Sequence, residues 1–274
     1  MNTVQDLDNH LPLGADLQVG KMPAHWLMAR LGKRILRPGG RETTAWLLER
    51  VQPGADDDVV ELAPGLGITA CELLARRPAS YTGIERDPGA VRFTERQLLR
   101  AGAADARILR ADAERIPLPD GSASLVFGEA MLSMQPEAKK AAIFAEVCRL
   151  LRPGGRYAVH ELAVIPEDLD PKRLEDIQHD LGRAIHVGVR IGTPAQWKKL
   201  LEQAGLRLEA VTTTPMRLLE WDRLVDDEGI WGTLRFACNV LRTPGALARL
   251  WEVRRTFRRH AGHLCAVALV AGKP

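Results

Sequence analysis

The stretch from Asp58 to Arg77 constrains the fold of this chain more than any other. It reads DVVELAPGLGITACELLARR, in which a short apolar run containing Glu61 is followed by a turn with Gly65 and Gly67 and then by apolar residues at helical spacing. Glycine allows the backbone to turn tightly and to approach a ligand closely. The stretch therefore predicts a buried parallel strand, a ligand-binding turn and a helix.

The sequence of this turn is compatible with either of two nucleotide-type cofactors. The residues from Gly65 to Ala70 read GLGITA, which fits the dinucleotide fingerprint, and Glu85 lies where that fingerprint places an acid on a ribose. Glu61 favours a different ligand, because a carboxylate just ahead of the turn would repel a pyrophosphate but suit the ammonium and sulfonium charges of S-adenosylmethionine. A glycine turn that binds no ligand is the third interpretation.

Further strands follow this first unit. One ends in Glu85, the next ends at Asp112, and another covers residues 123–128; a helix at 136–151 and a Pro-Gly-Gly turn then lead into a fifth strand. In an open α/β sheet the carboxyl ends of the strands line one crevice, where ligands bind. We therefore expect the polar residues at these strand ends to lie together.

These ordered motifs, from about Val59 to Leu162, resemble those of class I S-adenosylmethionine-dependent methyltransferases, in the style of the ubiquinone/menaquinone C-methyltransferase and related small-molecule enzymes. The resemblance implies a Rossmann-like α/β fold: a seven-stranded sheet, mostly parallel with the last strand antiparallel, helices on both faces and a helical cap. The first motif of that family usually reads acid-x-Gly-x-Gly-x-Gly. Ala63 stands at the first glycine here, and we expect this departure to be mild if Ala63 lies outside the positive-φ region.

The resemblance also assigns parts of S-adenosylmethionine to the strand ends. Glu61 and the turn would face the methionine part, and Glu85 would accept from both ribose hydroxyls. Asp112 would accept from the adenine amino group, and Glu129 would lie near the transferable methyl. The full expected cofactor set is Glu61, Ala63, Pro64, Gly65, Gly67, Glu85, Arg86, Asp112, Ala113, Glu129 and Ala130.

Methyl transfer from a sulfonium needs mainly positioning and desolvation, because the cofactor carries its own leaving group. An acceptor with a hydroxyl or an acidic carbon also loses a proton. The candidate bases are His160 at the end of the fifth strand, His186 in the segment after it, and Glu129. Side chains alternate along a strand, so at most one of His160 and Glu161 faces the crevice. Both histidines could instead be structural.

The length suits a single domain, residues 1–274, with a cofactor-binding core at 42–163. Residues 1–41 form an expected amino-terminal cap, and the segments 164–193 and 215–263 are expected cap insertions over the substrate site. Four of the six tryptophans fall in the first and last of these segments and indicate a hydrophobic small-molecule acceptor. Alternatively, they only attach the cap helices to the core.

Composition adds mostly exclusions. The formal net charge of +3 is too small to indicate a nucleic-acid or membrane partner, and we expect the basic run at 254–259 to be a solvated helix face. Four scattered cysteines indicate neither a zinc site nor a disulfide framework, so no metal is expected. The sequence shows neither a secretory signal nor a membrane-spanning run, and a cytoplasmic location is the default expectation.

The favoured function is methyl transfer from S-adenosylmethionine to oxygen or carbon of a hydrophobic small molecule. The alternatives are a non-catalytic S-adenosylmethionine-binding regulatory or scaffold protein and an NAD-dependent oxidoreductase. Glu61 opposes the oxidoreductase, and so does the absence of a Tyr-x-x-x-Lys pair, because Tyr81 and Tyr157 are followed four residues later by acids. The acceptor, the methylated atom and the oligomeric state stay open.

Overall fold

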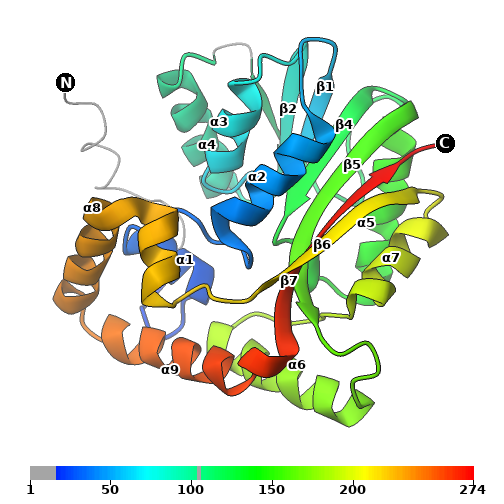
Figure 1. Cartoon of the computed structure of the whole chain (residues 1–274). Coiled ribbons are helices and arrows are strands. Elements are labelled where there is room, and N and C mark those ends of the chain that lie inside the picture. Colours follow the sequence, from blue (N-terminus) through cyan, green and yellow to red (C-terminus); the bar gives the residue numbers. More distant parts are fainter. Residues whose placement is uncertain (1–16, 104–105) are drawn as a thin grey trace.

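A computed structural model describes residues 17–103 and 106–274 of the chain. Its centre is a seven-stranded sheet in the order β3-β2-β1-β4-β5-β7-β6 (Figure 1). The strands β1 to β5 pair in parallel, and β7 runs antiparallel to both of its neighbours. The strands are β1 (Asp58–Leu62), β2 (Ser80–Glu85), β3 (Arg107–Arg110), β4 (Ala123–Glu129), β5 (Leu151–Val164), β6 (Arg207–Pro215) and β7 (Leu264–Gly272). The expected sheet, with one antiparallel strand, is confirmed.

Side-chain alternation along the strands divides the core into two layers. Val60, Val126 and Val159 point to one face, whereas Val59 and Leu125 point to the other. Helices α5 (Glu137–Leu150) and α7 (Pro194–Gln203) pack on the first face; α2 (Gly40–Val51), α3 (Ile68–Leu74) and α4 (Pro88–Arg100) pack on the second. Covered on both faces, the central strands are apolar along most of their length, as is typical of parallel sheets.

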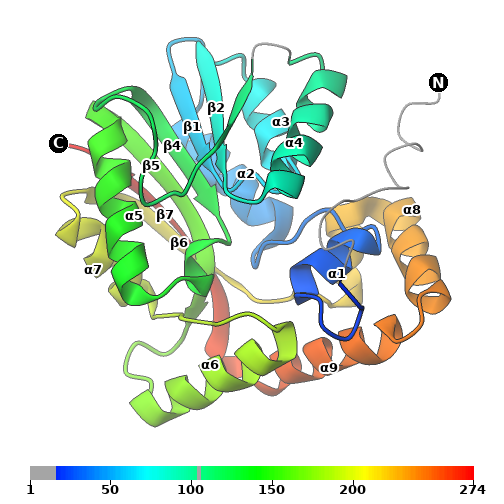
Figure 2. The same cartoon turned by 180° about the vertical axis from the view of Figure 1, so that it is seen from behind.

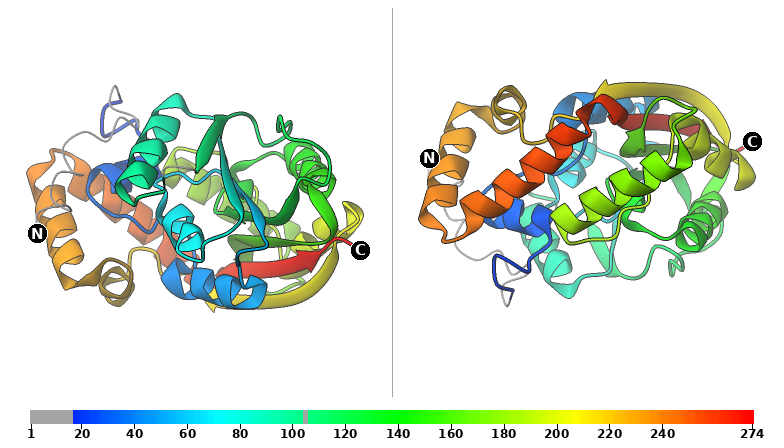
Figure 3. Two further views of the ribbon diagram at one scale, coloured as in Figure 1. Left: turned by 90° about the horizontal axis from the view of Figure 1, so that it is seen from above. Right: turned by 90° about the horizontal axis from the view of Figure 1, so that it is seen from below.

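The remaining helices form a separate layer beyond the carboxyl ends of the parallel strands (Figures 1 and 2). They are α1 (Ala24–Arg30), α6 (Pro171–Ile185), α8 (Trp221–Arg242) and α9 (Ala246–Arg259). Their own apolar cluster joins α1, α8 and α9, and a second cluster joins α6 to the end of β5. Seen from below, α6 and α9 lie side by side (Figure 3). The described parts of the expected cap segments therefore lie at the edge of the sheet where ligands bind in this fold class.

Helix α8 is interrupted at Gly229, whose φ of 72° is outside the helical region. Its two halves therefore point in different directions, and the second half leads through a short turn into α9. Within the described ranges, no helix is long and apolar enough to cross a membrane.

Candidate functional site

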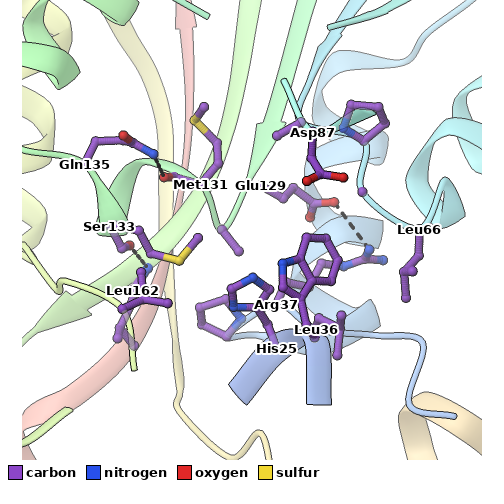
Figure 4. A pocket seen from close by; sticks show the side chains of 18 of the residues that line it. His25, Leu36, Arg37, Leu66, Asp87, Glu129, Met131, Ser133, Gln135 and Leu162 are labelled. Carbon is purple, nitrogen blue, oxygen red and sulfur yellow. Dashed lines mark hydrogen bonds and ion pairs between the residues drawn. The ribbon is translucent and has the colours of Figure 1, made fainter. Parts of the chain in front are cut away.

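A cavity of about 760 Å³ lies between the carboxyl edge of the sheet and the cap helices. Met131, Ser133 and Leu162 line one wall and Leu66 and Asp87 the other, and the cap side closes the space between them (Figure 4). The volume falls in the range of small-molecule sites. Every residue of the expected cofactor set lines it except Gly67, which starts helix α3 beside it.

The turn after β1 is held in an unusual backbone conformation. Ala63, Gly65 and Gly67 have φ values of 51°, 55° and 70°, and the Thr94 hydroxyl donates to the Gly65 carbonyl oxygen at 2.7 Å. Ala63 does not meet the condition under which its departure from the family pattern was expected to be mild, because its φ is positive. A left-handed conformation costs a residue with a Cβ about 1–2 kcal/mol, so the alanine adds strain that a glycine would not have.

Glu85 is fixed in position by its own turn. The amides of Arg86 and Asp87 donate to Oε1 at 2.7 and 3.0 Å. Burial raises the pKa of Glu85, while hydrogen bonds from backbone amides oppose that rise. The carboxylate is thus presented to the cavity in one orientation, as a ribose site requires.

Asp112 is paired with a lysine that the sequence did not indicate. Lys139 Nζ lies 3.1 Å from Asp112 Oδ2 and 3.3 Å from Glu114 Oε1. Burial alone would raise the pKa of Asp112, but the hydrogen bonds from Lys139 and the Glu114 amide lower it. Asp112 is partly exposed and ion-paired, whereas Glu85 is buried.

Glu129 is the most heavily bonded acid of the site. Its Oε1 accepts from Thr44 at 2.6 Å and from His160 Nδ1 at 3.0 Å, and its Oε2 accepts from Thr69 at 2.7 Å and lies 3.5 Å from Arg37 Nη1. Burial would raise the pKa of Glu129, but Arg37 and His160 together lower it to about 2. Glu129 is therefore a fixed anion and a poor proton acceptor.

His160 lies outside the cavity lining and is fully buried. The Gly39 amide donates to Nε2 at 3.0 Å, so the ring proton sits on Nδ1 and is donated to Glu129. Glu161, on the other face of β5, accepts from the amides of Met131, Leu132 and Ser133. Neither residue lines the cavity, so the structure gives His160 no direct contact with a ligand there; its ring contacts Glu129 instead.

His186 ends helix α6 in a left-handed conformation and is exposed. Its neighbours Ile185 and Val187 line the cavity, but His186 does not. The structure therefore gives this candidate base no contact with the cavity either.

Two cavity residues were missed. His25, on α1, lies beside Trp26 with ring centroids 4.6 Å apart, and burial lowers its pKa to about 4. Arg37 donates from Nη1 to Thr69 at 2.8 Å, whereas its buried Nε and Nη2 have no hydrogen-bond partner. Both come from the segment before α2. The sequence signal was the MPAHW run in an expected cap, but nothing local shows which of its side chains faces the sheet.

Glu61 completes the polar half of the cavity. The Tyr81 hydroxyl donates to Glu61 Oε2 at 2.6 Å. Burial raises the pKa of Glu61 to about 8, despite the opposing effect of that hydrogen bond. The cavity lining thus includes Arg37, which keeps two N–H groups without a partner among the described residues, and an acid, Glu61, that stays protonated at neutral pH until a positive charge approaches it.

The other half of the cavity is apolar. Side chains from the cap and from the loop after β4 line it, among them Met28, Met131, Ile185, Met216, Val253 and Phe257. The cavity therefore combines charged groups at the strand ends with a hydrophobic chamber under the cap helices.

An α/β sheet in this strand order, with acids at the strand ends around a glycine turn, defines a nucleotide-type ligand site. Comparison with known proteins gives the class. Residues 59–155 match the family model described as a methyltransferase domain. An uncharacterised protein of Haemophilus influenzae is 34% identical over 237 residues, which cover 86% of this chain and 89% of that protein.

Two characterised proteins are similar over smaller parts or in fold. The ubiquinone/menaquinone biosynthesis C-methyltransferase of Dinoroseobacter shibae is 30% identical over 125 residues, 44% of this chain and 48% of that protein. The crystal structure of the [4+2]-cyclase SpnF superposes with a TM-score of 0.65 at 19% identity, covering 85% of this chain and 81% of that one. This chain belongs to the class I S-adenosylmethionine-dependent methyltransferases.

Proposed function

We propose that the protein binds S-adenosylmethionine against the strand ends and transfers its methyl group to oxygen or carbon of a lipophilic small molecule held in the apolar half of the cavity. The observation that carries this proposal is the division of one cavity into two chemically different halves. A charged cofactor suits the first half, and an uncharged acceptor with apolar surface suits the second.

Each polar group of the cofactor has a suitable partner in the strand-end half of the cavity. Glu85 suits a ribose diol, because its orientation is fixed by its own turn. The unsatisfied Nε and Nη2 of Arg37 suit the methionine carboxylate, since buried guanidinium donors without partners are costly. Glu61 suits the ammonium, which would favour the charged form of this buried acid. When bound, the cofactor supplies an electrophilic methyl on a sulfonium leaving group.

Glu129 then acts as a positioning residue. It is an anion at every pH at which the protein would be assayed, because its pKa is about 2. Its hydrogen bonds with Thr44 and Thr69 link the end of β4 to α2 and α3. Its pairing with Arg37 holds the guanidinium in the cavity wall. These contacts fix the amino-acid end of the cofactor site before any ligand binds.

His25 is the cavity group best suited to orient an acceptor. Its pKa of about 4 keeps the imidazole neutral, so a ring nitrogen can accept a hydrogen bond from an acceptor hydroxyl without carrying a charge into an apolar chamber. His25 replaces His160 and His186 in the proposal, because neither of these lines the cavity.

The test has two stages. Calorimetric titration with S-adenosylmethionine, S-adenosylhomocysteine and NAD should show binding of the first two and not of the third. Incubation with methyl-labelled cofactor and a series of lipophilic alcohols, phenols and acidic carbon compounds should then show methyl uptake. Cofactor binding without methyl uptake by any acceptor would favour the non-catalytic alternative, and binding of NAD alone would overturn the assignment of the site.

A further inference from the structure

The second half of α8 and the first half of α9 carry a large apolar surface on their outer side. Six side chains form it, and each is at least half exposed. They are Ile230 (65%), Trp231 (84%), Leu234 (51%), Leu241 (75%), Leu247 (57%) and Trp251 (60%), called here the apolar hairpin face. Single exposed apolar residues are ordinary, but six on two consecutive helices are more than scattered surface residues and indicate an interaction site.

The pattern along α8 shows that this face is separate from the core. Phe236 and Val240 are buried in the cap cluster with α1 and α9. Ile230, Leu234 and Leu241 recur at helical spacing on another side of the helix, where the side chains are exposed. A helix that is apolar on both its inner and outer sides is expected to have a partner on each. Figures 1 and 3 show α8 and α9 at the outer edge of the cap.

Basic residues outnumber acids on this hairpin. From Gly229 to Arg255 the sequence has five arginines and one acid, Glu252, whose Oε2 lies 3.3 Å from Arg249 Nη1. Arg242 and Arg255 are exposed, and among the described residues neither forms a salt bridge. Tryptophan and leucine flanked by unpaired arginines are typical of helices that lie in the interface of an anionic bilayer. The whole-chain charge of +3 conceals this local distribution.

A second copy of the chain is a poorer partner for the same face. A two-fold contact through the hairpin would bring Arg242 and Arg255 of both copies together, and the one acid between Gly229 and Arg255, Glu252, is already paired with Arg249. A phosphate-rich lipid surface suits both kinds of side chain on this face. Its anionic groups can pair with the arginines, and the hydrocarbon beneath them can contact the apolar side chains.

We propose that the apolar hairpin face docks on the surface of an anionic lipid bilayer, with its six side chains in the interface and Arg242 and Arg255 at the lipid phosphates. Helix α9 then lies between the bilayer and the cavity, because Val253 and Phe257 on its inner side line the apolar chamber. Bilayer docking would supply a membrane-dissolved acceptor to that chamber. This last consequence rests on the proposed function, whereas the docking does not.

The test uses the full chain without cofactor or acceptor and measures cosedimentation with large unilamellar vesicles at low salt. Vesicles of phosphatidylcholine are compared with vesicles containing about one third phosphatidylglycerol. We expect binding to the anionic vesicles. The double variant Arg242→Glu/Arg255→Glu should bind about 25-fold or more weakly, at about fivefold for each arginine lost. The double variant Trp231→Ala/Trp251→Ala should bind about tenfold more weakly.

The matched control is Leu99→Ala, which removes a 64% exposed leucine from α4 on the core. It should bind vesicles as the unaltered chain does. All altered side chains are exposed, and equal thermal unfolding would show that every variant is folded. Equal vesicle binding by the arginine variant and the control, or no binding to anionic vesicles, would overturn the proposal. A dimer in light scattering that Trp231→Ala converts to monomer would assign the face to a second copy instead.

Discussion

The two halves of the cavity are built in opposite ways. At the strand ends, Glu85, Glu129 and Arg37 are held by hydrogen bonds to backbone amides or to other buried side chains. Under the cap, residues such as Met131, Met216 and Phe257 contribute apolar surface with few directional bonds. The first half specifies one ligand by fixed polar groups, and the second accepts a class of ligands by shape and hydrophobicity. Substitutions at the strand ends should therefore change stability or cofactor affinity, whereas substitutions under the cap should change the turnover of the acceptor.

The largest expected effect is at Arg37, whose loss would leave the buried Glu129 without its cationic partner. Arg37→Met should lower the free energy of unfolding by about 3–5 kcal/mol, the scale for breaking a buried ion pair. Chemical denaturation followed by circular dichroism measures it. The double variant Arg37→Met/Glu129→Gln should recover part of the loss, because the unpaired charge is gone. A double variant no more stable than the single one would show that the pair contributes little.

Glu85→Ala should weaken cofactor binding by about 2–4 kcal/mol, the scale of two charge-assisted hydrogen bonds. Calorimetry with S-adenosylhomocysteine measures it. Asp112→Ala is the comparison, since that carboxylate is already paired with Lys139 and is only partly buried; its effect should be smaller. Equal losses in the two variants would mean that the ribose is not bound at Glu85.

Cofactor affinity should rise with pH because of Glu61. Its pKa is about 8 in the free protein, so at neutral pH the carboxyl is mainly protonated and must lose a proton to pair with the ligand ammonium. From pH 6 toward pH 8 the affinity for S-adenosylhomocysteine should rise about tenfold per unit, or about 1.4 kcal/mol. It should level off near pH 8, where the ligand's own α-amino group begins to titrate. Glu61→Gln should make the affinity nearly independent of pH in this range; a slope kept in that variant would place the titrating group elsewhere.

The sequence predicted the strand-end half well because its signals are local. The sheet, the glycine turn and the placement of Glu85 each follow from short stretches in which strand, turn and acid are adjacent. Ala63 was the exception, since its positive φ is imposed by the turn and not by its own preference. Arg37 and His25 could not be predicted, because their position depends on how the segment before α2 folds back onto the sheet.

The same reason explains why the sequence did not predict that His160 lies outside the cavity lining. Alternation along β5 correctly separates His160 from Glu161, but the loop of Gly39 covers one face and the loop at Met131–Ser133 covers the other. Strand periodicity cannot predict which face is covered by segments far away in the chain. The distribution of arginines around the hairpin of α8 and α9 was likewise hidden by a whole-chain net charge.

A substitution of His25 tests whether the cap half of the cavity binds the acceptor. His25→Phe keeps a ring beside Trp26 but removes both nitrogens, so turnover of a hydroxyl acceptor should fall about tenfold, the scale of one hydrogen bond. Cofactor affinity should stay unchanged, because no strand-end group is altered. The imidazole of His25 gains a charge only below about pH 4 and stays neutral from about pH 5 to 7. Titration of His25 should therefore not change the turnover rate within that range. A decline in cofactor affinity in this variant would indicate that His25 contacts the cofactor at the strand ends and not the acceptor.

The smallest effect should come from His186, whose side chain does not line the cavity although both of its chain neighbours do. His186→Asn keeps a residue that tolerates the left-handed conformation at the end of α6, so stability should change by no more than about 0.5 kcal/mol. Turnover and cofactor affinity should both equal those of the unaltered protein. Because Ile185 and Val187 on either side do line the cavity, this variant separates the effect of an exposed side chain from that of the segment carrying it. Slower turnover with unchanged stability would return His186 to the catalytic site and would require the end of α6 to move when an acceptor binds.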